Sequence, residues 1–531
     1  MHDGMLCWDF EGSGKVGGHD NMNDFGNFRM GLSQAISHWG KYYGNKGAII
    51  SDNKIINYND LDKFVESWAQ SIYGNIGSNN RVAICQTDSI CFFVSLVSIL
   101  RSNNVDCIIN AELPVEKIQL CAEDCDAKLI LMDEETTKSR PSILNMVDIP
   151  KRIVSLSEKD VNPVKASWPL PKPYDDWGIV YTSGTTSSPK GVILSHMAIF
   201  SELMGWFIEL EMTKKTRLYV SVPPYYTAGL VLASTTLMTG GTLVNFRCHS
   251  PELYASYLEK SMVDISYLSP GELQELVSYF KSHTPLPHIG DKILILGEPV
   301  PFGLKKEARN LLSVDIIESW GNSEGLGTIT ESEDVEIRPN SIGRPFLCDE
   351  NFILDEYNNV LPDNEIGRIA GKTNCGFSGY NGRDDLNSQY IIGDSILSDD
   401  FGSRDKEGYF YINDRINYSF LTNGERIYSL EIEREIQKLP CVEEVAVIGL
   451  ESTKGTIPVA LIRLGNDKID TAKLVNRINE SLSENQKIRN IKYVDKFPKS
   501  IVGKNLKNEL KKLFEIDFAA DQTPVGRKEI Q

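Results

Sequence analysis

Short apolar stretches alternate with longer amphipathic or apolar stretches from about residue 31 to residue 321. The first kind has the length and β-branched content of strands, and the second has the length of helices. This alternation favours parallel sheets covered by helices, because parallel strands need helix-length crossover connections. The expected strands include "GAIIS", "RVAICQ", "DCIIN", "AKLILM", "RLYVSV", "GTLVNF", "ILILG" and "VDIIESWG". Ligands of open α/β sheets bind outside the carboxyl ends of such strands.

Three expected helices show clear boundary or burial signals. "NDLDKFVESWAQSIYGNI" begins at Asn59, a candidate cap, and "SHMAIFSELMGWFIEL" begins at Ser195, another candidate cap. "ICFFVSLVSIL" (90–100) is almost wholly apolar, but it is shorter than the ~18 residues of a membrane span. We therefore expect it to be a buried helix.

The pattern of expected elements changes after about residue 340, where short polar strands and turns dominate. A smaller α/β unit follows from residue 427. We expect an α/β protein with a large N-terminal domain of helix-covered, mostly parallel sheets and a small barrel-like β subdomain, followed by a small mobile C-terminal α+β domain. The predicted divisions are a flexible extension (1–30), the N-terminal domain (31–413), a hinge (414–418), the C-terminal domain (419–515) and a tail (516–531).

Charge and cysteine content limit the possible partners. The net charge of −18 disfavours nucleic acid and acidic membranes, whereas ATP and CoA need only local positive charge. The ten cysteines are scattered and no metal-ligand pattern appears, so we interpret them as reduced core residues. No signal peptide or long apolar stretch is present, and we expect a cytoplasmic protein without a membrane span. "GSGK" (12–15) follows no strand and is interpreted as part of a flexible tail.

One loop has the composition of a phosphate-binding site. "YTSGTTSSPKGVILSH" (181–196) follows the expected strand "WGIVY" and precedes an expected helix. It is not a Walker A loop, because Gly191 follows Lys190 instead of preceding it. Glycine lets backbone N–H groups approach phosphate oxygens closely, and the hydroxyl side chains and the lysine add donors. Taken alone, the loop is equally typical of a Ser/Thr-rich surface loop.

Six motifs in a fixed order resemble those of the AMP-forming acyl and aryl acid ligases, the superfamily of acyl-CoA synthetases, peptide-synthetase adenylation domains and luciferases. They are "YTSGTTSSPKGV", "SWGNSEG", "SIGRP", "SDDFGSRDKEGYFYINDR", "NGERIYSLEIE" and "PKSIVGKNLK". The resemblance covers roughly residues 31–510. The first motif departs from the family at Ser187, where the family has glycine.

The resemblance implies a reaction in two halves. A carboxylate attacks the α-phosphate of ATP to give an acyl-adenylate and pyrophosphate, and a thiol then displaces AMP. The first half brings an anion to a polyanion, so charge neutralisation and positioning dominate catalysis. ATP and Mg²⁺ are the expected cofactors, with CoA or a carrier-protein phosphopantetheine as the thiol and a small carboxylic acid as the substrate.

The resemblance also assigns roles to individual residues. Glu324 would bind Mg²⁺ and act in catalysis, and Trp320 would stack on adenine, although a core tryptophan is the alternative. Lys504 would bridge the attacking carboxylate and the α-phosphate; the alternative is a solvated lysine of a basic helix. The other nucleotide-binding residues would be Thr182, Ser183, Gly184, Thr185, Thr186, Lys190, Gly297, Glu298, Gly321, Asn322, Ser323, Asp400 and Arg415.

Two aspartates compete for the ribose hydroxyls. Asp394 matches the letters of the family's Thr-Gly-Asp motif, whereas Asp400 matches its spacing, eight residues before Gly408. We prefer Asp400, because the geometry of the following strand matters more than the preceding glycine. Asp399 then occupies a position where the family has glycine.

The acyl pocket departs from that of the amino-acid-activating relatives. Tyr226, in "PPYYTAG", stands where those enzymes carry an aspartate that pairs with the α-ammonium group. Tyrosine supplies no charge, and an unpaired buried ammonium is unfavourable by several kcal/mol. We therefore expect an aryl or aliphatic acid and not an α-amino acid. Gly325, with Gly297 and Gly327, would leave room for a flat ring.

The hinge and the acceptor leave three hypotheses open. Asn417 occupies the hinge position and tolerates unusual dihedrals, and Gly424 would line the thiol's tunnel. The first hypothesis is an acid–CoA ligase, and the second is a free-standing ligase that loads a separate carrier protein in a natural-product pathway of secondary metabolism. The third is a degenerate nucleotide-binding homologue, favoured by the substitutions at 187, 399 and 417 but disfavoured by the residues kept at 324, 400, 415 and 504.

Overall fold

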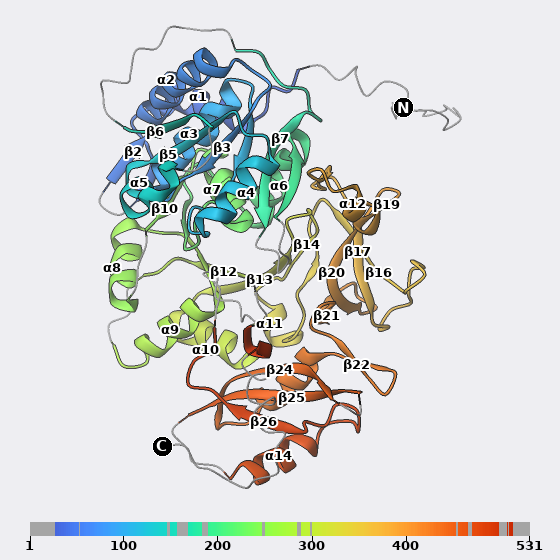
Figure 1. Cartoon of the computed structure of the whole chain (residues 1–531). Coiled ribbons are helices and arrows are strands. Elements are labelled where there is room, and N and C mark those ends of the chain that lie inside the picture. The colour runs from blue at the N-terminus through green and yellow to red at the C-terminus, as the bar shows by residue number, and fades with distance from the viewer. Residues whose placement is uncertain are drawn as a thin grey trace, which may run out of the picture.

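The structure is a computed structural model. It describes residues 27–51, 54–145, 149–156, 168–182, 189–246, 250–283, 288–297, 300–452, 455–465, 470–498, 507 and 509–512. This part of the chain forms two large sheets, a curled third sheet and a C-terminal domain (Figure 1). The α/β fold class expected from the sequence is confirmed.

The first large sheet has the strand order β18-β8-β7-β4-β3-β5-β6. Its strands are β3 (Arg81–Cys85), β4 (Val105–Ile108), β5 (Leu129–Asp133), β6 (Lys151–Val154), β7 (Asp176–Thr182), β8 (Lys190–Ser195) and β18 (Gly379–Tyr380). The strands from β7 to β6 are parallel, whereas β8 is antiparallel to β7. The stretch 181–196 precedes a helix as expected, since the next helix begins at His196, but its residues "KGVILS" form a strand that pairs with β7, which was not expected.

The second large sheet has the order β15-β14-β13-β12-β11-β9-β10-β1-β2, with parallel strands from β13 to β1. Its strands are β1 (Gly47–Ser51), β2 (Lys54–Asn57), β9 (Arg217–Val220), β10 (Thr242–Asn245), β11 (Ile265–Leu268), β12 (Lys292–Leu296), β13 (Asp315–Gly321), β14 (Gly327–Ile329) and β15 (Arg344–Pro345). β13 contains the tryptophan and glycine of the "SWGNSEG" motif.

Helices cover both large sheets (Figure 1). They are α1 (Leu32–Tyr43), α2 (Tyr58–Ile76), α3 (Ser89–Arg101), α4 (Val115–Asp124), α5 (Glu134–Ser139), α6 (His196–Glu209), α7 (Thr227–Met238), α8 (Pro251–Ser261), α9 (Pro270–Phe280), α10 (Phe302–Leu312) and α11 (Asp334–Ile337). The main core joins α1, α2, α3, α6 and α7 to strands of both sheets. α8, α9 and α10 cover the opposite face of the second sheet, and α4 covers the opposite face of the first.

The predicted buried helix is confirmed, because every residue of α3 is buried. The cap at Ser195 is also confirmed, since its hydroxyl accepts a hydrogen bond from the N–H of Ala198 (3.1 Å). The cap predicted at Asn59 is wrong. α2 begins at Tyr58, whose fully buried side chain fixes the helix start, and Asn57 accepts the hydrogen bond from Asp60 instead (2.8 Å).

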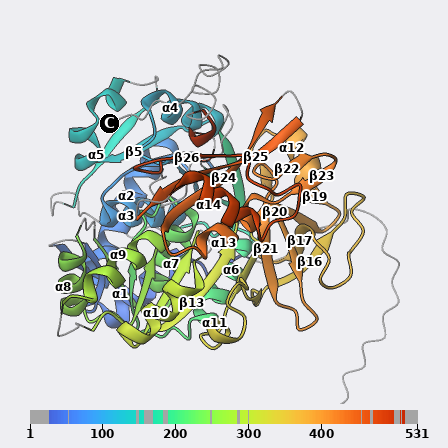
Figure 2. The ribbon, with the colours of Figure 1, turned by 90° about the horizontal axis from the view of Figure 1, so that it is seen from below.

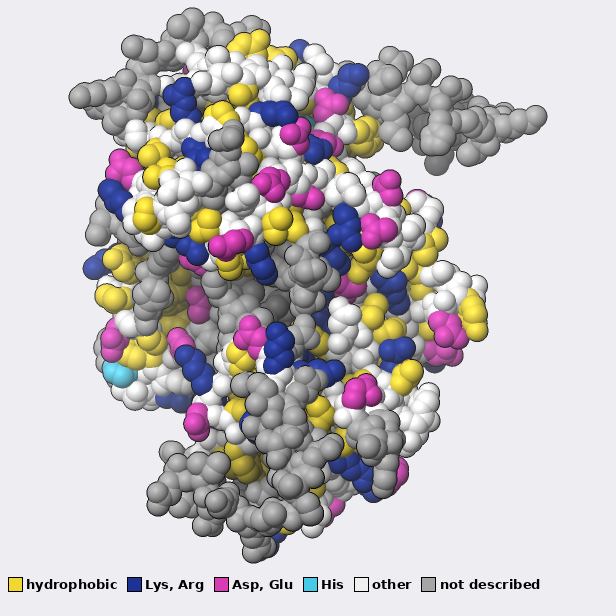
Figure 3. Space-filling view, viewed as in Figure 1, with side chains coloured by type: hydrophobic (Ala, Val, Ile, Leu, Met, Phe, Trp, Pro, Cys, Tyr) yellow, Lys and Arg dark blue, Asp and Glu magenta, His cyan; other side chains and the backbone are white. Residues whose placement is uncertain are grey.

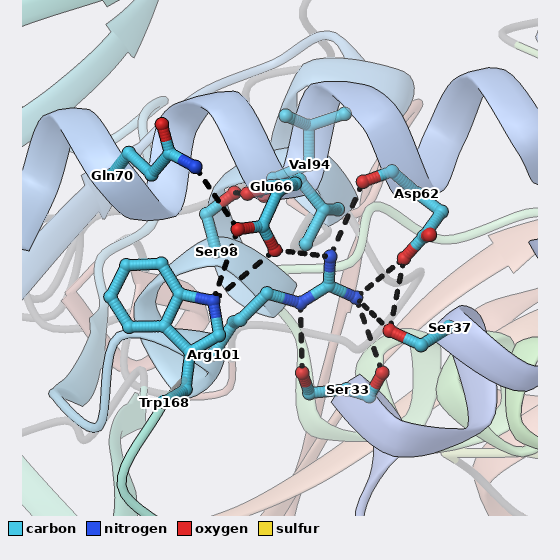
Figure 4. A network of polar contacts seen from close by, with 10 residues as sticks. Ser33, Ser37, Asp62, Glu66, Gln70, Val94, Ser98, Arg101 and Trp168 are labelled. Atoms are coloured by element: carbon cyan, nitrogen blue, oxygen red, sulfur yellow. Dashed lines mark hydrogen bonds and ion pairs between the residues drawn. The ribbon is translucent and has the colours of Figure 1, made fainter. Parts of the chain in front are cut away.

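A buried arginine joins the first three helices (Figure 4). The Arg101 guanidinium, at the end of α3, lies 2.7 Å from Asp62 and 3.3 Å from Glu66, both on α2. It also donates to the carbonyl oxygen of Ser33 (3.3 Å) and the hydroxyl of Ser37 (2.7 Å) on α1. The Arg101 side chain is only 5% exposed, so these partners supply the compensation that a buried charge needs.

The third sheet consists of β16 (Asp349–Leu354), β17 (Gly367–Thr373), β19 (Ile391–Ile392), β20 (Ser395–Arg404) and β21 (Phe410–Arg415), with α12 (Asp384–Tyr390) beside it. The C-terminal domain contains β22 (Phe420–Thr422), β23 (Glu425–Ile427), α13 (Ser429–Gln437), β24 (Val442–Ser452), β25 (Gly455–Leu464), α14 (Thr471–Asn479) and β26 (Asn490–Tyr493). Figures 1 and 2 show this domain packed below the third sheet and α10.

Side-chain contacts fix this packing. The rings of Phe401 on β20 and Tyr428 lie 5.8 Å apart, and the Arg426 guanidinium lies 5.0 Å from the Phe401 ring. Asn413 on β21 donates to Glu431 on α13 (2.7 Å). The C-terminal domain therefore has a defined orientation against β20 and β21.

The surface and the cysteines agree with the sequence. Basic and acidic side chains are interspersed on the face shown in Figure 3, so the net charge of −18 does not form a single acidic face there. All eight cysteines in the described residues are free, and seven of them are buried. None of the helices in the described part combines the length and apolar character that crossing a bilayer requires.

Candidate active site

The phosphate loop lies between β7 and β8. Residues 183–188, which include the predicted Ser183, Gly184, Thr185 and Thr186, lie outside the described residues. On the flanking strands, Thr182 pairs with Lys190. The Lys190 ammonium lies 5.6 Å from the centre of the Tyr380 ring and 5.3 Å from that of Tyr390. Two aromatic rings therefore position this cation by cation–π contacts.

The Tyr380 hydroxyl donates a hydrogen bond to Glu324 Oε1 at 2.5 Å. Burial raises the pKa of Glu324, while the Tyr380 bond and the positive charge of Lys190 oppose that rise by favouring the carboxylate. The neighbouring Phe377 N–H donates to the backbone carbonyl of Glu324 (3.0 Å). Phe377 therefore holds the backbone of this glutamate, and Tyr380 on β18 holds its side chain.

Glu324 fits a magnesium site. No group of three or more His, Cys, Asp or Glu side chains suited to a metal is found among the described residues. Mg²⁺ commonly keeps several waters and takes only one or two carboxylates plus substrate phosphates. A single half-buried carboxylate whose charge is stabilised by Tyr380 and Lys190 meets this requirement.

The predicted ribose pair lies beside the predicted adenine residue. β20 and β21 pair Asp400 directly with Arg415, and their side chains form an ion pair with Arg415 Nε 3.3 Å from Asp400 Oδ1. Trp320 Nε1 donates to Asp400 Oδ2 at 3.1 Å. The alternative, Asp394, is exposed and pairs with Lys372 (2.9 Å). The spacing argument therefore selects the aspartate that the structure brings to Trp320.

Asp399 connects the two groups of residues. Its Oδ2 lies 3.7 Å from an Arg415 nitrogen, and its Oδ1 accepts a hydrogen bond from Tyr390 (2.6 Å), whose ring also contacts Lys190. The contacts run without a break from Trp320 to Glu324. Sequence reasoning missed Tyr380 and Tyr390, and it treated Asp399 only as a departure; β18 gives no strong signal because it has only two residues.

The remaining residues of the "SWGNSEG" motif shape a turn. Asn322 Oδ1 accepts from the Leu326 N–H (2.9 Å), and Gly321 pairs with Gly327 across β13 and β14. Gly325 has φ +108°, and a Cβ there would collide with the carbonyl oxygen of Cys375. The space expected at Gly325 is therefore filled by backbone.

Tyr226 lies at the start of α7, near the same motif. Its hydroxyl accepts a hydrogen bond from Asn110 Nδ2 (3.3 Å), and burial raises the pKa of Tyr226 to about 12. The next residue, Thr227, is hydrogen-bonded to the hydroxyl of Ser323 (2.7 Å). Gly297, with φ +116°, follows β12, and Glu298 lies outside the described residues.

The predicted hinge lies between the third sheet and the C-terminal domain. Asn417 is exposed, and the N–H of Tyr418 donates to the carbonyl of Arg415 (3.0 Å). Gly424 (φ +83°) forms, with Asn423 (φ +52°), the two-residue turn between β22 and β23. Positive φ at both positions is typical of a type I′ hairpin turn.

Lys504 lies outside the described residues, but Lys507 is described. The buried Lys507 ammonium lies 2.6 Å from Glu433, donates to the Ser429 hydroxyl (2.7 Å), and lies 5.1 Å from the centre of the Tyr418 ring. The chain just after Lys504 is therefore fixed to α13 and to a residue beside the hinge.

Comparison with known proteins identifies the family. Residues 36–381 match the family model of the AMP-binding enzymes, and residues 431–504 match that of the AMP-binding enzyme C-terminal domain. The first match covers more than half of the chain, which therefore belongs to the AMP-binding enzyme family. This confirms the resemblance seen in the six motifs: the protein is an AMP-forming acid–thiol ligase, an enzyme class that uses ATP, Mg²⁺ and CoA.

Three similar proteins illustrate the range of the family. The long-chain-fatty-acid–CoA ligase FadD13 of Mycobacterium tuberculosis is 24% identical, over 83% of this chain and 89% of its own. The fatty acid–[acyl-carrier-protein] ligase ScoC of Streptomyces coeruleorubidus is 22% identical, over 92% and 97%. The crystal structure of ATP-bound MatB from Rhodopseudomonas palustris is 21% identical, covers 92% of this chain and 100% of its own, and has a TM-score of 0.84, which shows the shared fold.

Proposed function

We propose that this protein activates an aryl or aliphatic carboxylic acid as its acyl-adenylate, releases pyrophosphate, and transfers the acyl group to CoA. The observation that carries this proposal is the unbroken series of contacts from Trp320 through Asp400 and Arg415 to Glu324. It joins an aromatic surface, an aspartate–arginine pair, a cation and a carboxylate within one site. These are the groups that a nucleoside triphosphate needs.

The nucleotide would lie along this series. Asp400 would accept hydrogen bonds from the ribose hydroxyls while Arg415 holds its carboxylate in place, and Trp320 would pack against adenine. Lys190 would face the β- and γ-phosphates with the loop 182–186. Glu324 would hold Mg²⁺, which supplies positive charge to the phosphates when bound.

The two half-reactions would use different faces of the C-terminal domain. We propose 31–413 and 419–515 as the two domains and 414–418 as the hinge, with Asn417 as its pivot. Lys504 would bridge the acid's carboxylate and the α-phosphate during adenylation. Rotation about Asn417 would then withdraw Lys504 and bring the turn at Gly424 toward the path of the thiol.

Tyr226 supports the choice of acid. Burial raises its pKa to about 12, so it is neutral near pH 7 and cannot neutralise an α-ammonium group. Its hydroxyl is bonded to the neutral Asn110 amide, and the negative charge of Glu112 also raises the pKa of Tyr226. The choice of an acid without an α-ammonium group rests on Tyr226, which is uncharged at the position where the amino-acid-activating relatives carry aspartate.

A carrier protein is the second candidate for the thiol. ScoC, a fatty acid–[acyl-carrier-protein] ligase, aligns with this chain over 97% of its own length. The adenylation residues would be the same in both cases, so only the thiol separates the two candidates. A degenerate homologue without activity is the third and least favoured candidate.

Acid-dependent pyrophosphate release tests the proposal. A panel of aryl, aliphatic and α-amino acids would be assayed with ATP and Mg²⁺, first without a thiol and then with CoA or with a phosphopantetheinylated carrier protein. We expect release with acids that lack an α-ammonium group, and consumption of the adenylate by CoA. Highest kcat/KM for an α-amino acid would contradict the proposed acid class, and consumption only by the carrier protein would select the second candidate.

A further inference from the structure

Gln86 is a buried amide without a hydrogen-bond partner. It directly follows β3 and is 1% exposed, yet neither Oε1 nor Nε2 is hydrogen-bonded. Leaving both a donor and an acceptor unpaired in the interior is unfavourable, so native proteins rarely keep such a group without a reason. A ligand that enters at this point would provide the missing partner.

The alternation of β3 sets the direction in which Gln86 points. Cys85 belongs to the core beneath α4, whereas Ile84 belongs to the core between the two large sheets. Successive side chains of a strand alternate between faces, so Gln86 shares the face of Ile84. Tyr226 and Trp320 pack against that same core. Gln86 therefore lies on the strand face of Ile84, which belongs to the core that Tyr226 and Trp320 also contact.

Strand register brings Gln86 to Asn110. The ladder between β3 and β4 pairs Ile84 with Ile108, and the Ile109 N–H continues it by donating to Ile84 (3.0 Å). When this register is extended by two residues, beyond the ends of β3 and β4, Gln86 falls level with Asn110. Neighbouring strands are only ~4.8 Å apart, so the two amides lie within reach of a common small group.

Asn110 leads from Gln86 to the reaction site. Its Oδ1 is engaged by the Glu112 N–H (2.8 Å), and its Nδ2 donates to the Tyr226 hydroxyl. Thr227 then contacts Ser323, one residue before Glu324. Asn110 and Tyr226 thus connect the end of β4 to the residues beside the proposed metal-binding carboxylate.

The backbone beside Gln86 is rigid. The N–H groups of Thr87 and Asp88 both donate to Asp133 Oδ2, at 2.7 and 2.9 Å. Asp88 in turn caps α3 through the Cys91 N–H (2.9 Å). A fixed backbone keeps the Gln86 amide in place, as a specificity-determining group requires.

We propose that Gln86, with Tyr226, recognises a hydroxyl group on the side chain of the acid, away from its carboxylate. The Gln86 amide offers both a donor and an acceptor, and the Tyr226 hydroxyl, which already accepts from Asn110, still has its hydrogen to donate. A hydroxyl is the smallest neutral group that both donates and accepts. The inference rests on the proposed function and narrows its substrate class to hydroxy acids.

Matched pairs of acids test this recognition. The pairs are benzoate with 3- and 4-hydroxybenzoate, cinnamate with 4-hydroxycinnamate, and octanoate with 8-hydroxyoctanoate, and kcat/KM for acid-dependent pyrophosphate release is compared within each pair. A site built to bond a hydroxyl rejects the analogue that lacks it, so we expect a preference of about tenfold or more for the hydroxy acid in at least one pair. Gln86→Leu should reduce that ratio to about 1–2 by removing both polar atoms.

Two readouts separate recognition from a structural role. Gln86→Leu should keep or raise the thermal unfolding temperature, because it removes a buried amide that has no partner. Ser95→Ala is the matched control: Ser95 is a fully buried hydroxyl in α3 without a hydrogen-bond partner, and its loss should leave the hydroxyl preference unchanged.

Four results would overturn the inference: no pair favours the hydroxy acid, Gln86→Leu leaves the ratio unchanged, Ser95→Ala lowers it equally, or Gln86→Leu raises KM for CoA and not for the acid. The last result would assign Gln86 to binding of the thiol substrate.

Absence of pyrophosphate release with every acid would instead contradict the proposed function. Calorimetric binding of the same pairs in the presence of AMP then tests Gln86 separately, with the same loss of preference expected in Gln86→Leu.

Discussion

Replacing Tyr380 with phenylalanine should move the acid limb of the pH–rate profile to higher pH. The Tyr380 hydroxyl donates to Glu324 at 2.5 Å and so stabilises the carboxylate form. Burial already raises the pKa of Glu324, and this hydrogen bond opposes the rise. The variant keeps the aromatic ring that contacts Lys190 and loses only the oxygen. The pKa of Glu324 must therefore rise further.

The size of the shift follows from the strength of one hydrogen bond to a charged group. Such a bond contributes about 1.5–3 kcal/mol, and one pKa unit corresponds to about 1.4 kcal/mol, so the shift should be about 1–2 units. A higher pKa means that less carboxylate is present at a given acidic pH. Because only the carboxylate binds Mg²⁺ well, activity should be lost at a higher pH in the variant.

The assay is kcat/KM for acid-dependent pyrophosphate release between pH 5 and pH 9 at saturating ATP and Mg²⁺. Tyr390→Phe is the matched control, because its ring also contacts Lys190 but its hydroxyl donates to Asp399 (2.6 Å). We expect its acid limb to coincide with that of the unmodified protein. An unmoved limb in Tyr380→Phe, or an equal shift in Tyr390→Phe, would refute the assignment of Glu324 as the titrating group.

Three further predictions concern the C-terminal domain and the core. Lys504→Ala should abolish adenylate formation while ATP binding, measured by calorimetry, persists; undiminished pyrophosphate release would reject this role. Asn417→Pro fixes φ at the proposed pivot, so adenylation and thioester formation from preformed acyl-adenylate should fall unequally; equal loss would indicate misfolding, and no loss would place the pivot elsewhere. Arg101→Met leaves two carboxylates without their buried cation and should lower the free energy of unfolding by about 3–5 kcal/mol in urea, whereas Lys138→Met, which breaks an exposed pair, should not change the unfolding midpoint. An unchanged urea curve for Arg101→Met would show that its pairs contribute no net stability.

The elements of the fold were predictable wherever local signals agreed with burial. The apolar run of α3 and the cap at Ser195 were expected from the sequence, and the structure contains both. The start of α2 was missed because the fully buried Tyr58, and not the polar Asn59, fixes the first turn. β8 was missed because its apolar residues Val192–Leu194 lie between the phosphate loop and the helix that Ser195 caps, and the whole stretch was interpreted as loop.

The candidate site was predictable only where a motif and a strand coincide. Spacing alone selected Asp400 over Asp394, and the structure pairs Asp400 with Arg415 on adjacent strands of the same motif. Tyr380 and Tyr390 come from the segment between the motifs. They reach Lys190 and Asp399 only after β18 pairs with β8, a contact between segments far apart in the chain. No local pattern encodes such a contact.

The buried ion pair of Lys507 sets a tether length for the proposed catalytic lysine. Three residues of extended chain span at most about 11 Å, so the backbone of residue 504 must remain within that distance of the backbone of Lys507, whose ammonium is held by Glu433 on α13. Replacing Glu433 would remove the ion pair that holds Lys507, so the Lys504 ammonium would sample a larger volume. Its effective concentration near the reacting atoms would then fall, as it does with a longer linker. A residue that touches no substrate would then act on the rate through effective concentration alone.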